Sequence, residues 1–274
     1  MSTAAVDDRV GAPRGPRVRR IALMALAALA GLFYSVMMGG VPALTAPWFD
    51  DSTKGHQVHD VAWGIVVFVL LAVPLLLQVH RPETKPAAMQ QAFMVPVSFL
   101  IAMSLSLAME PEPVVIMGVP LAILTLLHPA RREIFTPGRF SGTLGAMAGM
   151  GALGFGAFVL DQAARQRNLP LSNEHTEFLH WATMAVMGIA IVLVALVASL
   201  KTRGWRIPAW CAGVASILFG AASLVMNQRP SSVKGWGAVA ILGGIAFIGE
   251  AEWEHHQDVP EPAAGEPGLD AGTT

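Results

Sequence analysis

Long apolar runs dominate the chain, and eight of them contain no Lys or Arg. A stretch of about 20 predominantly apolar residues is long enough to cross the hydrocarbon core of a bilayer as an α-helix. The pattern predicts an all-α, polytopic integral membrane helix bundle with eight transmembrane helices. The runs cover residues 21–38, 61–79, 92–109, 114–127, 142–160, 178–200, 207–226 and 235–249.

Two of these runs have alternative interpretations. The run 21–38 follows a basic flank, as a secretory signal would, but it is long and Val36-Met37-Met38 is a poor cleavage site. We therefore expect a retained span. The run 114–127 is short and contains Pro120, which predicts either a kinked span or a segment that enters the membrane and returns.

Composition supports a membrane protein and excludes several other classes. The chain has 274 residues, of which 54% are hydrophobic and 14% are charged, whereas a soluble domain has about 25% charged residues. These values exclude a soluble enzyme and a disordered chain. Its one cysteine, Cys211, excludes a disulfide-rich secreted domain. The apolar runs predict the lipid bilayer as a partner, and the net charge of −1 predicts no nucleic-acid partner.

The basic residues predict the orientation in the plasma membrane. With the N-terminus in the cytoplasm, thirteen Lys and Arg side chains lie inside and five outside, which follows the positive-inside rule. Eight spans return the C-terminus to the cytoplasm. We expect a disordered N-terminal segment (1–20), a basic cytoplasmic linker (129–140) and an acidic disordered tail (251–274).

The two membrane halves, 21–128 and 141–250, resemble each other at an offset of about 120 residues. The segment 106–109 (SLAM) corresponds to 223–226 (SLVM), and His59 corresponds to His180. We therefore expect two tandem, parallel four-helix repeats related by a pseudo-two-fold axis along the membrane normal. The alternative is that any two apolar four-helix units look alike.

Glycines are frequent within the run 142–160. Gly145 and Gly149 form a small-xxx-small pair, which is typical of closely packed transmembrane helices. We expect this pair to pack against a neighbouring helix.

Histidines near the outer face are the strongest candidates for chemistry. Four lie there: His56, His59, His175 and His180. His56 and His59 are three residues apart, as are Glu177 and His180, so each pair shares a helix face. The repeat relates His59 to His180 and His56 to Glu177, and it places two methionines at the same level. The candidate metal ligands are His56, His59, Glu177, His180, Met109 and Met226.

Imidazole and thioether groups at one depth suit copper, and imidazole also suits zinc or the axial positions of a haem. If the set binds a metal, His59 and His180 should approach each other. The alternative is that these histidines make hydrogen bonds at the interface and that the methionines are ordinary apolar residues. Asp60, beside His59, either caps a helix N-terminus or orients a histidine.

Other chemistry has little support in the sequence. It contains no phosphate loop, no nucleophile elbow and no zinc-hydrolase motif. No pair of carboxylates falls in mid-membrane, which weighs against an ion-coupled pump. The sequence favours a non-enzymatic multi-pass membrane protein with a structural, partner-binding or small-solute role. The alternative function is copper, zinc or haem binding by the outer His and Met residues.

Overall fold

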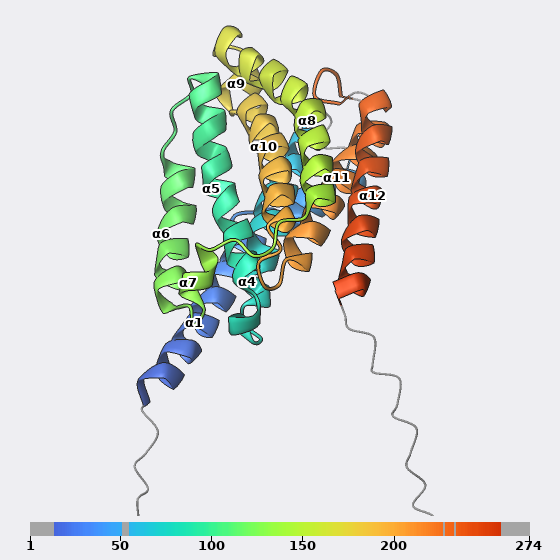
Figure 1. Cartoon of the computed structure of the whole chain (residues 1–274). Coiled ribbons are helices and arrows are strands. Elements are labelled where there is room, and N and C mark those ends of the chain that lie inside the picture. The colour runs from blue at the N-terminus through green and yellow to red at the C-terminus, as the bar shows by residue number, and fades with distance from the viewer. Residues whose placement is uncertain (1–13, 51–54, 227, 233, 259–274) are drawn as a thin grey trace, which may run out of the picture.

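The computed structural model describes residues 14–50, 55–226, 228–232 and 234–258, and all regular elements within them are helical (Figure 1). The α-helices are α1 (Arg14–Leu32), α2 (Gly40–Thr45), α3 (Gln57–Gly64), α4 (Val73–Leu77), α5 (Pro86–Ser106), α6 (Glu112–Leu127), α7 (Arg131–Ile134), α8 (Gly142–Asn168), α9 (Glu174–Glu177), α10 (His180–Ser199), α11 (Arg206–Met226) and α12 (Lys234–Asp258). Two π-helical stretches, η1 (Phe33–Met37) and η4 (Ile65–Ala72), and two short 3₁₀ turns, η2 (Ala46–Trp48) and η5 (Pro82–Thr84), join them.

Seven helices are long and apolar enough to cross a membrane, within the residues described. The predicted fourth span is α6, whose 16 residues extend about 24 Å. It is therefore shorter than a typical span. The described helices also extend into both expected tails, because α1 begins at Arg14 and α12 ends at Asp258. The expected disorder of 1–13 and 259–274 lies outside the described residues.

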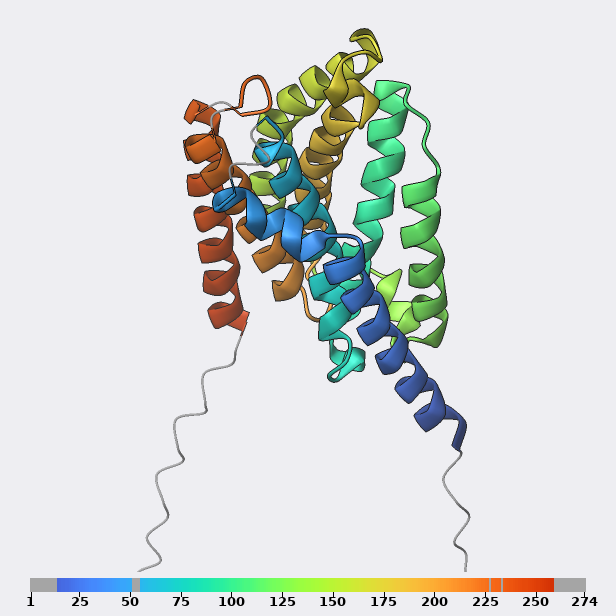
Figure 2. The ribbon, with the colours of Figure 1, turned by 180° about the vertical axis from the view of Figure 1, so that it is seen from behind.

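The bundle has an interior helix and peripheral helices that are largely exposed. In the apolar part of α10, 72% of the residues are buried, against 17% in α8 and 22% in α12. α10 packs on α3, α5, α8 and α11. The exposed side of α8 carries Met150, Leu153 and Leu160, as expected for a helix that meets lipid. Seen from behind in Figure 2, α1 crosses the bundle and packs against α4.

Pro74 interrupts the helical hydrogen bonds of the second span, and a buried glutamine compensates. Proline has no N–H, so it cannot donate to a carbonyl in the preceding turn. Gln91 Nε2 on α5 lies 3.2 Å from the carbonyl oxygen of Leu70 and 3.5 Å from that of Val69. Gln91 is fully buried, so this polar group joins α5 to η4 inside the apolar core.

Glycines bring α11 and α12 close together. A Cβ atom on Gly220 would lie 2.4 Å from the carbonyl oxygen of Gly237, and one on Gly244 would lie 2.5 Å from that of Gly213. The prediction that Gly149 packs on a neighbouring helix is wrong, since a Cβ atom there would meet nothing within 4 Å. The three atoms nearest to a Cβ on Gly145 all belong to Phe140, a residue just before its own helix.

Different elements lie at the two ends of the bundle (Figure 1). The start of α1 and the end of α12 lie at the same end as α4 and α7, whereas α9 lies at the opposite end (Figure 1). At the first end, Arg19 donates to the carbonyls of Leu126 and Leu127 and so caps α6. There His128 Nε2 also lies 3.2 Å from Gln78 Oε1.

Candidate metal centre

Four histidines meet at the end of the bundle that carries α9. One ligand atom from each of His56, His59, His175 and His180 lies within 4.8 Å of the others. His56 directly precedes α3 and His59 lies in its first turn, while His175 lies in α9 and His180 begins α10. Two distant segments of the chain therefore contribute two histidines each.

Local backbone structure positions the second pair. The side chain of Asn173 caps α9 by accepting hydrogen bonds from the backbone N–H groups of His175 and Thr176. Leu179 then adopts the left-handed region at φ 56°, which is uncommon for a residue other than glycine. This turn separates α9 from α10 and directs His175 and His180 towards the same point.

The four rings are in contact. The centroids of the His59 and His180 rings are 5.0 Å apart, and those of His56 and His175 are 4.8 Å apart. The expected approach of His59 to His180 is therefore observed. His56 Nδ1 lies 3.1 Å from His180 Nδ1. Two nitrogens bonded to one zinc ion at a tetrahedral angle are about 3.3 Å apart, given zinc–nitrogen bonds of ~2.0–2.1 Å.

Three of the four histidines have a contact partner at Nε2. His59 Nε2 lies 2.8 Å from Ser231 Oγ, His175 Nε2 lies 3.2 Å from the carbonyl oxygen of Gly55, and His56 Nε2 lies 3.2 Å from Glu174 Oε1. His59 Nδ1 is buried and has no hydrogen-bond partner among the described residues. Nδ1 is thus the nitrogen left for a ligand in His59 and His175, and in His56 it is the nitrogen that contacts His180. Metal-binding histidines commonly donate the other N–H to a carboxylate or carbonyl in this way.

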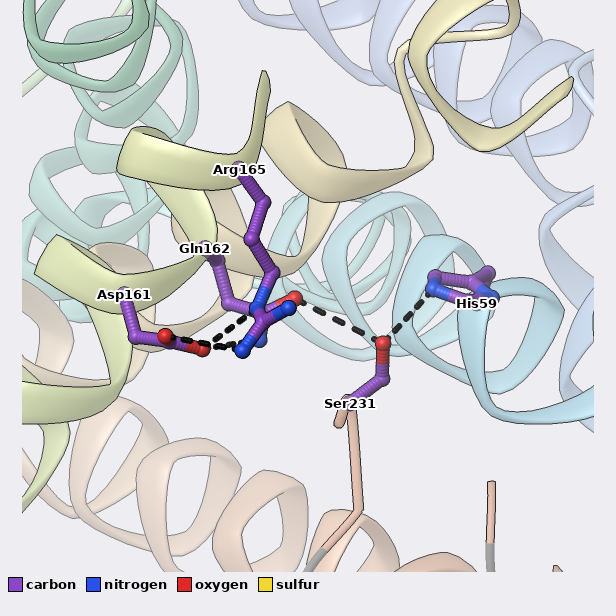
Figure 3. A network of polar contacts seen from close by, with 5 residues as sticks. All are labelled: His59, Asp161, Gln162, Arg165 and Ser231. Carbon is purple, nitrogen blue, oxygen red and sulfur yellow. Dashed lines mark hydrogen bonds and ion pairs between the residues drawn. The ribbon is translucent and has the colours of Figure 1, made fainter. Parts of the chain in front are cut away.

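A chain of polar side chains supports His59 (Figure 3). Ser231 Oγ lies 2.8 Å from His59 Nε2 and donates to Gln162 Oε1 at 3.5 Å. Gln162 Nε2 donates to Asp161, which also pairs with Arg165 at 2.8 Å. His59, Gln162 and Ser231 are at most 3% exposed, so water does not readily replace any member. When the Ser231 hydroxyl donates to Gln162, its oxygen is left to accept from His59, which then carries its proton on Nε2.

The remaining predicted ligands lie in different surroundings. Glu177 is exposed at the end of α9 and lies outside the group of four; Glu174, one turn earlier, contacts His56 instead. Met109 is 69% exposed beyond α5, and Met226 ends α11, packed against the core. The predicted ligand set omitted His175.

The sequence carried one signal for His175, its position near the outer face. Its separation of five residues from His180 matches no helical repeat, and the two are brought together by the turn at Leu179.

Comparison of the chain with protein-family models, curated proteins and solved structures finds no match.

Proposed function

We propose that this integral membrane protein binds one divalent transition-metal ion through His56, His59, His175 and His180. The observation that carries the proposal is the convergence of four imidazoles, three of which have Nε2 held by a second partner. Isolated interfacial histidines need no common centre. A metal site requires a shared arrangement in which a second partner holds one ring nitrogen and the other nitrogen faces the common centre.

The donor set supports zinc or copper. Imidazole binds both ions, and a shell of soft thioethers, which selects Cu(I), is not part of the group of four. Haem is a poorer fit, because five of the six ring pairs have centroids only 4.7 to 5.4 Å apart, which leaves no space for a porphyrin between them. The sixth pair, His56 and His59 at 6.4 Å, lies within one turn of the chain, so its rings cannot face each other across a porphyrin. Four protein ligands also complete a tetrahedral shell, which favours holding a metal over metal-assisted hydrolysis.

We also propose that α6 crosses the membrane with the seven longer helices, which makes eight spans in two parallel repeats. Both ends of the described chain lie at one end of the bundle, as an even number of crossings requires (Figure 1). The basic residues of α7 lie at that end, which supports its placement in the cytoplasm of a plasma-membrane protein. The metal site then faces outward.

Metal titration of the purified protein tests the function. We expect chelator-stripped protein in detergent to bind one Zn²⁺ or Cu²⁺ per chain. His59→Ala and His175→Ala should each weaken binding more than tenfold, and binding should weaken below about pH 6, where protons compete for imidazole. His255→Ala is the matched control at the opposite end of the bundle. The proposal fails if the two site variants bind as tightly as the control.

A further inference from the structure

A cavity of about 310 Å³ lies directly beside the four-histidine site. It is formed between α3, α5 and α10, and the segment joining α5 to α6 contributes to its wall. Its lining includes His59, Asp60, Trp63, Phe99, Met103 and His180. Its volume falls within the range of small-molecule sites, which is roughly 300–1,000 Å³.

One wall of this cavity is apolar and aromatic. The rings of Trp63 and Phe99 pack edge to face with centroids 6.2 Å apart, and Met103 is buried against the same core. The Trp63 indole N–H donates to the carbonyl oxygen of Met38 at 2.8 Å. The tryptophan can therefore offer a guest only its ring surface. This wall fits a flat, apolar body.

The other wall carries two polar groups that each have a hydrogen-bonding atom to spare. The Asp60 carboxylate interacts electrostatically with His56 but accepts no side-chain hydrogen bond from the described residues. Within the described residues, His180 is the one histidine of the four whose Nε2 makes no hydrogen bond, since its contact with His56 is through Nδ1. If Nδ1 of His180 binds the metal, its Nε2 carries a proton and needs an acceptor, while Asp60 needs a donor. A hydroxyl group can serve both.

We propose that this cavity binds a quinol, a membrane-soluble aromatic ring that carries hydroxyl groups. The ring packs against Trp63 and Phe99, and one hydroxyl accepts from His180 Nε2 and donates to Asp60. The quinol thereby supplies the fourth outer partner of the histidine cluster. This inference rests on the proposed metal site, because metal binding at Nδ1 is what leaves the His180 N–H facing the cavity.

Equilibrium dialysis of the Zn²⁺-loaded protein tests the inference, since zinc cannot oxidise a quinol. The probes are duroquinol and its dimethyl ether, which keeps the ring but loses both hydroxyl donors. We expect duroquinol to bind at least tenfold more tightly than the ether. Asp60→Ala should weaken duroquinol binding by about tenfold, the effect of one hydrogen bond to a charged group. Ala108→Trp, at the wall formed by the α5–α6 segment, should abolish it.

A separate zinc titration on every variant distinguishes the two proposals. Both variants should keep one Zn²⁺ per chain, because neither residue is a metal ligand. Equal affinity for duroquinol and its ether, or unchanged binding by Ala108→Trp, would overturn the quinol site and leave the metal site intact. A wild-type protein that binds no zinc would overturn the metal site, whatever the dialysis shows.

Discussion

Replacing Ser231 with alanine tests whether the partners of the histidines position them for a metal. The substitution removes the acceptor 2.8 Å from His59 Nε2 and leaves a buried N–H unpaired. His59 is 3% exposed, so water does not restore the hydrogen bond. A buried unpaired donor costs about 1–3 kcal/mol. If this free-energy cost weakens metal binding, the affinity falls by roughly 10–100-fold, which is the usual effect of removing such a partner.

The affinity is measured by competition with a chromophoric chelator in detergent. Ser232→Ala is the matched control, because Ser232 is 1% exposed and its hydroxyl has no hydrogen-bond partner among the described residues. We expect the control to stay within about twofold of the wild type. The reasoning is refuted if Ser231→Ala also stays within twofold, or if Ser232→Ala loses as much affinity as Ser231→Ala.

Three further predictions concern stability and topology. Burial lowers the pKa of His128 from 6.5 to about 4, so its neutral form stabilises the fold fully above pH 6.5. The free energy of unfolding should fall by about 3 kcal/mol as the pH drops from 6.5 to 4, and His128→Gln should lack this loss in thermal melts. Gly220→Ala should lower the melting temperature through its clash with Gly237, at a cost of about 1–3 kcal/mol, whereas Gly149→Ala should not. Reporter fusions should place the α8–α9 turn outside and the end of α12 inside; a fusion after α12 that reports outside would contradict eight spans.

The spans were largely predictable because apolar length is itself the cause of membrane insertion. The sequence did not decide whether α6 is a full span, since Pro120 and a short run allow two outcomes. It also did not show which glycines pack. Gly149 and Gly220 have similar local surroundings in sequence, but Gly220 faces α12 and Gly149 faces open space. That difference depends on how each helix is rotated in the bundle, which spacing alone does not specify.

The candidate site was partly predictable from helical spacing and from the resemblance between the two halves. His56 and His59 are one helical turn apart, and the resemblance between the halves related His59 to His180. Choosing Glu177 assumed one continuous helix through His180. In the structure α9 ends at Glu177, and the left-handed Leu179 starts α10 in a new direction. The left-handed conformation of Leu179 therefore explains why His175, and not Glu177, lies near the other histidines.

The separation of the two histidine pairs in the chain has a consequence for biosynthesis. His56 and His180 are 124 residues apart, and Ser231 follows later still. At synthesis rates of about 5–20 residues per second, the second pair is synthesised roughly 6–25 s after the first. A metal ion supplied during translation would find an incomplete site throughout that interval. If the proposed site binds a metal, loading is a late event, and a bound ion would report that both halves of the nascent protein have come together.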